Sequence, residues 1–162
     1  MRGFVYSVNV RGEGGVPKLP VRSAKLVFDG VEGDFNKFRT AKRGGSPARA
    51  VCIYSLERIE ALQEEGHPIS PGTTGENLTI EGIDWSALEI GMRMKIGKST
   101  IELTEPCAPC NVIADSFKDR KSVRIDHDVE RGWSRWLASV IDEGIVAVGD
   151  FEIGRASCRE RV

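Results

Sequence analysis

The chain lacks several features that would assign it to a specialised class of protein. No apolar run approaches the roughly 18 residues of a membrane-spanning helix, and no apolar secretory stretch follows the N-terminal Met1-Arg2-Gly3-Phe4. The formal net charge is only −1, whereas a broad nucleic-acid-binding surface is typical of a basic domain. These absences predict a protein of the reducing cytoplasm that binds neither membranes nor nucleic acid.

Cysteine is also scarce, with four in 162 residues. In a reducing compartment these are thiols, metal ligands or core residues before they are disulfides. No second Cys-x-x-Cys accompanies Cys107 and Cys110. Only Cys52, His67 and His127 could complete a zinc site, and their irregular spacing argues against one.

Glycine, in contrast, is abundant, with 18 residues or about 11% against a usual 7%, which favours short strands and tight turns. Alternating residues predict strands over 4–10, 21–28, 48–54 and 76–80, and hairpins of 92–96 with 100–103 and of 145–148 with 151–153. Ser55 and the apolar Leu56, Ile59 and Leu62 predict a helix. The spacing of apolar residues over 133–141 predicts another. Together these elements predict a mixed, strand-dominated domain with a few short helices and a closed or partly closed sheet.

The last nine residues, 154–162, do not continue this pattern. They are basic and aperiodic, and they resemble the translation of a common sequencing-adapter DNA. We therefore expect a single domain over residues 1–153, followed by a non-native tail over 154–162.

The segment Cys107-Ala108-Pro109-Cys110 carries the strongest chemical signal. It ends a predicted strand and precedes a candidate short helix over 111–117, whose N-terminus would stabilise a thiolate. The two cysteines fit a dithiol redox centre, although hairpins flank them instead of a βαβ unit. One thiolate can instead ligate a soft transition metal, or both residues can simply be buried. For Cys107, burial without a chemical role explains the residue as well as any function does. For Cys110, a functional role is the better interpretation.

Two further segments could bind an anion. The stretch 72–79 offers backbone N–H groups and threonine hydroxyls, which can hold a phosphate, although a plain turn explains it as well. A basic stretch could hold a phosphate by charge-assisted hydrogen bonds, although a solvated loop is the simpler interpretation of each residue in it. Its members are Lys37, Arg39, Lys42, Arg43 and Arg49.

A series of short motifs follows one another along the chain. They are Gly30-Val31-Glu32-Gly33-Asp34, Gly44-Gly45, Arg49-Ala50-Val51, Gly75-Glu76-Asn77-Leu78-Thr79, Pro109-Cys110, Arg131-Gly132-Trp133 and Val148-Gly149-Asp150. In this order the motifs resemble the MOSC domain, the C-terminal domain of molybdenum cofactor sulfurases, which also occurs as a small bacterial stand-alone protein. The resemblance extends over residues 7–153.

The resemblance implies a β-barrel-like fold and binding of the molybdenum cofactor, a pterin phosphate that carries the metal. The family is also associated with pyridoxal phosphate. By position Cys110 would be the catalytic thiol and molybdenum ligand, while Cys107 stands where many relatives have Arg. Two further departures are Arg43 in place of His and Phe35 in place of Arg. The residues implied around the cofactor are Thr74, Gly75, Glu76, Asn77, Arg39, Arg43 and Arg49.

From these observations we expect a molybdenum-cofactor-binding protein that reduces small N-hydroxylated substrates with electrons from a redox partner. Two alternatives stay open. The protein could carry persulfide sulfur on Cys110, received from a cysteine desulfurase, for metallosulfur cluster assembly. Alternatively it could be a dithiol oxidoreductase that needs both Cys107 and Cys110.

Overall fold

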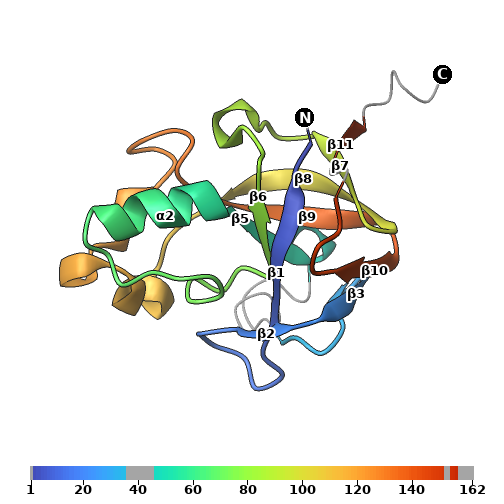
Figure 1. The fold of residues 1–162 in the computed structure, drawn as a ribbon, viewed down its shortest axis with the longest axis horizontal. Helices are drawn as coiled ribbons and strands as arrows, with labels where there is room; N and C mark the ends of the chain where they lie inside the picture. The colour runs from blue at the N-terminus through green and yellow to red at the C-terminus, as the bar shows by residue number, and fades with distance from the viewer. Residues whose placement is uncertain (1, 36–45, 152–153, 157–162) are drawn as a thin grey trace.

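The structure is a computed structural model that describes residues 2–35, 46–151 and 154–156. Its strands form two sheets (Figure 1), one of eight strands in the order β11-β7-β8-β9-β5-β6-β1-β2 and one of three in the order β10-β3-β4. The strands are β1 Phe4–Val10, β2 Leu19–Val21, β3 Ser23–Val27, β4 Gly30–Val31, β5 Val51–Ser55, β6 Leu78–Glu81, β7 Arg93–Ile96, β8 Ser99–Cys107, β9 Arg135–Asp142, β10 Gly144–Ala147 and β11 Gly154–Ala156.

The strand-dominated fold predicted from the sequence is confirmed. In the larger sheet β11 and β2 are edge strands, so the described strands form an open, barrel-like arrangement and not a closed barrel. Neighbouring strands are antiparallel except for β5 and β6. The helix α2, Leu56–Glu64, makes the crossover that such a parallel pair needs.

Local sequence signals explain α2. The Ser55 hydroxyl accepts a hydrogen bond from the Arg58 backbone N–H at 3.1 Å, which caps the first turn. Leu56, Ile59 and Leu62 are buried on one face, as predicted. No helix in the described part of the chain is long and apolar enough to cross a membrane.

The remaining helical segments are short 3-10 turns. They are η1 Pro47–Arg49, η2 Trp85–Ala87, η3 Asn111–Ser116, η4 Lys118–Arg120 and η5 Ser122–Ile125. Figure 1 shows the turns that follow β8 gathered with α2 at one side of the molecule, away from the smaller sheet.

The helix predicted over 133–141 was wrong, because most of this segment is the central strand β9. Residues 135–138 are all buried, since β9 lies between β5 and β8 and both of its faces are covered. A strand buried on both faces loses the alternation of period two, and its apolar run then imitates a helix.

The described residues at the end of the chain do not show the predicted hairpin of 145–148 with 151–153. The strand β10 pairs with β3 in the smaller sheet instead. The turn after it returns to β1, where the Gly149 N–H donates to the Val5 carbonyl and the Val5 N–H donates to the Asp150 carbonyl, both at 2.9 Å. Residues 152 and 153 lie outside the described residues. In the tail, β11 pairs with β7, but backbone pairing does not test the predicted non-native origin of residues 154–162.

Candidate functional site

Two buried cysteines share one face of the larger sheet. In register, Cys107 of β8 lies opposite Arg135 of β9, and Cys52 of β5 lies opposite Leu137 of β9. Side chains two residues apart on a strand point to the same face. Cys52, Cys107 and Leu137 accordingly form a small apolar cluster separate from the main core.

The third described cysteine, Cys110, differs from the other two because its side chain is exposed. It ends the segment 108–110, here called the thiol loop, which connects β8 to η3. The Ile113 N–H donates to the Cys110 carbonyl at 3.2 Å. Since η3 is a 3-10 turn of six residues, little helix dipole is available to act on the thiol. The accessible sulfur of Cys110 is the feature that a ligand or reactant can reach.

Arg135 joins the thiol loop to a second loop, residues 72–76. Its guanidinium donates through Nη1 to the Thr74 carbonyl at 2.7 Å and through Nη2 to the Ala108 carbonyl at 3.1 Å. The residue is 5% exposed. Sequence reasoning missed this residue, because it stands in a tryptophan-rich segment taken for a helix and only strand register brings it to the thiols.

The electrostatics of this face favour one ionised thiol. A hydrogen bond from the neighbouring Cys52 thiol lowers the pKa of Cys107 to about 6, against the effect of burial, and the positive charge of Arg135 acts in the same direction. The same hydrogen bond, together with burial, raises the pKa of Cys52. Of the two thiols, Cys107 is therefore the one whose ionised form this face favours.

The carboxylate of Glu76 is turned into the 72–76 loop. It accepts hydrogen bonds from the Gly72 N–H at 3.1 Å, the Thr74 hydroxyl at 2.8 Å and the Thr79 hydroxyl at 2.9 Å. Thr74 and Glu76 are both fully buried, and burial raises the pKa of Glu76. The loop's own carboxylate thus occupies the Gly72 N–H and the Thr74 hydroxyl, both of which were predicted to face a phosphate.

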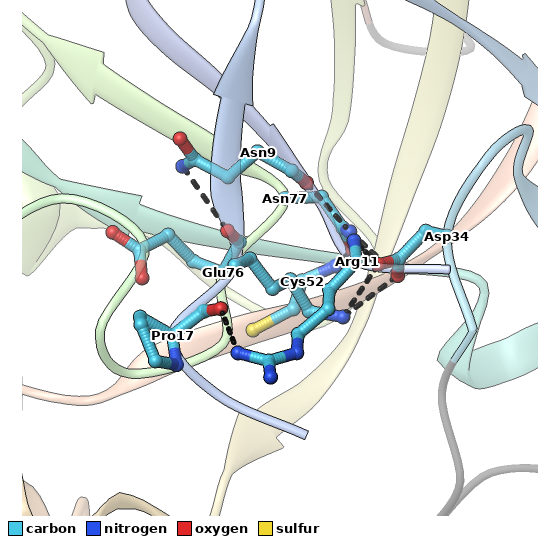
Figure 2. A network of polar contacts seen from close by, with 8 residues as sticks. Asn9, Arg11, Pro17, Asp34, Cys52, Glu76 and Asn77 are labelled. Carbon is cyan, nitrogen blue, oxygen red and sulfur yellow. Dashed lines mark hydrogen bonds and ion pairs between the residues drawn. The ribbon is translucent and has the colours of Figure 1, made fainter. Parts of the chain in front are cut away.

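Like Glu76, Asn77 uses its polar side-chain atoms in hydrogen bonds within the protein, as Figure 2 shows. Its side-chain oxygen accepts from the Cys52 N–H at 3.0 Å, and its amide donates to Asp34 at 3.0 Å and to the Asn9 carbonyl at 3.3 Å. Asp34 also forms an ion pair with Lys18 at 2.7 Å. Two motifs 43 residues apart in the sequence therefore meet beside the Cys52 backbone.

The predicted basic residues are placed unequally. Arg49 lies on η1, which packs against β9, and its Nη1 is 2.7 Å from the Glu105 carboxylate. Lys37, Arg39, Lys42 and Arg43 lie outside the described residues. Gly75 forms the turn of the 72–76 loop, with a φ of +80° that favours glycine. Within the described ranges, no cluster of three or more His, Cys, Asp and Glu residues could hold a metal ion.

Comparison with known proteins agrees with this architecture. The MOSC domain model matches residues 40–151. The chain is 29% identical over 139 residues to the uncharacterised protein YflK of Bacillus subtilis, covering 85% of this chain and 61% of YflK. It is 26% identical over 137 residues to the protein YiiM of Escherichia coli, covering 82% of this chain and 59% of YiiM. The chain thus spans about three fifths of the length of these relatives.

A solved structure leads to the same assignment. The crystal structure of YiiM from Escherichia coli superposes with a TM-score of 0.70 at 25% identity, covering 97% of this chain and 71% of that one. The motifs recognised in the sequence lie inside or beside the matched region, and Cys110 falls within it. The chain belongs to the MOSC domain family.

Proposed function

We propose that the protein binds the molybdenum cofactor and that Cys110 supplies the thiolate ligand of the metal. The observation that carries this proposal is that Cys110 presents an exposed sulfur on the thiol loop, while the other two described cysteines are buried. A soft thiolate suits a transition metal. When bound, the cofactor would supply two-electron redox chemistry at molybdenum.

The surroundings of Cys110 fit a ligand of this kind. A cofactor that carries its own metal needs few ligands from the protein, which agrees with a single exposed thiol. The buried guanidinium of Arg135 donates to the Ala108 carbonyl of the thiol loop, so the loop that carries Cys110 is anchored. Arg49, and Arg39 and Arg43 outside the described residues, are proposed as the cations that would attract an anionic pterin phosphate.

Within this proposal the 72–76 loop has a supporting role. Thr74, Glu76 and Asn77 hold the loop and the adjacent strands in place through their internal hydrogen bonds. The loop's contribution to cofactor binding would then come from its shape and from the Thr74 carbonyl, which anchors Arg135. The substrate class that we propose is small N-hydroxylated compounds, reduced in the cytoplasm with electrons from a partner protein.

Metal analysis tests the proposal. Wild type, Cys110→Ser and the control Val112→Ser, whose side chain is exposed two residues further on, are purified from a molybdenum-replete host. Plasma mass spectrometry measures molybdenum, and fluorescence measures the pterin. Molybdenum and pterin in the wild type and control, but not in Cys110→Ser, would support the assignment. Stoichiometric molybdenum in Cys110→Ser would refute it.

The exposure of Cys110 equally suits a second function, transport of persulfide sulfur. A cysteine desulfurase could reach this thiol directly, whereas Cys52 and Cys107 are shielded. Mass spectrometry after incubation with a desulfurase and cysteine would show added sulfur on Cys110. An unmodified Cys110 would exclude the carrier function. The dithiol function has weaker support, because the structure associates Cys107 with Cys52 in the buried cluster.

A further inference from the structure

Arg135 is a buried cation whose polar contacts in the described structure include no carboxylate. Its two hydrogen-bond acceptors are the backbone carbonyls of Thr74 and Ala108. In the described residues it forms no ion pair with Asp or Glu, and its buried Nε has no hydrogen-bond partner. A buried charge is strongly destabilising unless another charge compensates it. The compensating charge should therefore come from a neighbour of another type.

Cys107 is the best-placed source of that charge. It lies directly opposite Arg135 on the adjacent strand and is 7% exposed. Glu76 is a poorer source, because burial disfavours its ionised form more than the hydrogen bonds within its own loop favour it. The groups that face Cys107 are Cys52 from β5, Arg135 from β9, Arg49 and Glu105.

We propose that Arg135 is the positioning residue of the Cys110 thiol: its buried guanidinium ties the thiol loop to the 72–76 loop, and the Cys107 thiolate on the neighbouring strand balances its charge. The inference rests on the proposed role of Cys110, which it deepens by naming what holds that sulfur in place. Cys107 then acts as the anion of a buried ion pair, without contacting the ligand of Cys110.

The arrangement has a direct chemical consequence. The Ala108 carbonyl accepts from Arg135 only two residues before Cys110, so the cation restrains the start of the thiol loop. A lysine at position 135 would keep the charge, but its single ammonium group could not reproduce the fork that joins the Thr74 and Ala108 carbonyls. Substitution of Arg135 by lysine therefore separates the effect of its charge from its effect on the position of the thiol loop.

The first test titrates the thiols by their ultraviolet thiolate absorbance. Wild type should show one thiol with a midpoint near 6, and Cys107→Ser should lose this component. Arg135→Met should raise the midpoint by at least about one unit, a tenfold fall in ionisation, whereas Arg135→Lys should stay close to wild type. Arg93→Met, which removes an arginine of β7 paired with Glu102, is the matched control. An unchanged midpoint in folded Arg135→Met would overturn the ion pair.

The second test follows hydrogen exchange of the Ile113 amide, which is bonded to the Cys110 carbonyl. Both Arg135 variants should exchange it at least about tenfold faster, because hydrogen bonds from a charged donor are lost, while Arg93→Met should not. Unchanged exchange in both variants would overturn the positioning role. If Arg135→Met does not fold, the proposal can still be overturned. Unchanged exchange in Arg135→Lys would overturn the positioning role, and a thiol that still titrates near 6 in Cys107→Ser would overturn the ion pair.

These readouts do not depend on molybdenum. Wild type without bound molybdenum would count against the proposed function, and yet the titration and the exchange rates would still decide the role of Arg135. Conversely, a normal metal content together with unchanged thiol behaviour in the variants would leave the function standing and refute the positioning role.

Discussion

Glu76 offers the most direct test of how the 72–76 loop is built. Its carboxylate is the shared acceptor for one backbone N–H and two threonine hydroxyls. In Glu76→Ala all three donors lose their acceptor, and each buried unsatisfied donor costs about 1–3 kcal/mol. We expect a loss of about 3–9 kcal/mol in the free energy of unfolding, a large part of the 5–15 kcal/mol typical of a domain.

Glu76→Gln should behave very differently. The amide oxygen can take the place of the carboxylate oxygen that accepts from Gly72 and Thr79. The amide nitrogen then faces the Thr74 hydroxyl, which can rotate and accept a hydrogen bond. Because the amide is uncharged and burial already disfavours the ionised carboxylate, we expect a change within about 1 kcal/mol. The exposed Glu60 of α2 provides the matched control, Glu60→Gln.

The pH dependence follows from the direction of the pKa shift. Burial raises the pKa of Glu76 above 4.5 in the folded protein, so the folded state binds more protons than the unfolded state above that pH. This contribution to stability is fully present below the unfolded pKa and is lost as the pH rises through the folded pKa. Relative to wild type, Glu76→Gln should therefore gain stability as the pH rises from about 4.5.

Urea unfolding followed by tryptophan fluorescence measures these differences. With a slope of about 2 kcal/mol/M, Glu76→Ala should lower the midpoint by about 1.5–4.5 M at neutral pH. A loss below about 1 kcal/mol in Glu76→Ala, or equal losses in the Ala and Gln variants, would refute the hydrogen-bond argument. Parallel pH profiles of wild type and Glu76→Gln would refute the raised pKa of Glu76.

Three further substitutions test the frame of the site, each by urea unfolding. Gly72→Ala should destabilise by at least about 2 kcal/mol, because φ is +87° and the new methyl group would meet the Lys18 carbonyl; a neutral effect would show that the loop shifts freely. Lys18→Met should cost about 3–5 kcal/mol, because Asp34 is left charged and buried, and the loss should shrink in the double variant with Asp34→Asn. Tyr54→Phe should cost about 1 kcal/mol, because its hydroxyl donates to the Trp133 carbonyl at 2.6 Å; a larger loss would indicate a packing role instead.

The elements that could be predicted correctly are those whose sequence signals are local. Ser55 and the three apolar residues after it specified α2, because capping and helical spacing act within a few residues. The hairpin of β7 and β8 followed from alternation around Gly97 in the same way. The family, too, could be recognised, because its motifs are short contiguous segments, and Cys110 was singled out by its position in one of them.

The surroundings of Cys110, in contrast, depend on contacts between strands that are far apart in the sequence. The strand β9 could not be read correctly, because burial on both faces removes the alternation that marks a strand. The register between β8 and β9 then placed Arg135 opposite Cys107, 28 residues away in the chain. Likewise the hydrogen bonds of Glu76 are satisfied within its loop only once the chain is folded. Contacts between distant strands have no local signature, because their partners are set by packing of the whole sheet.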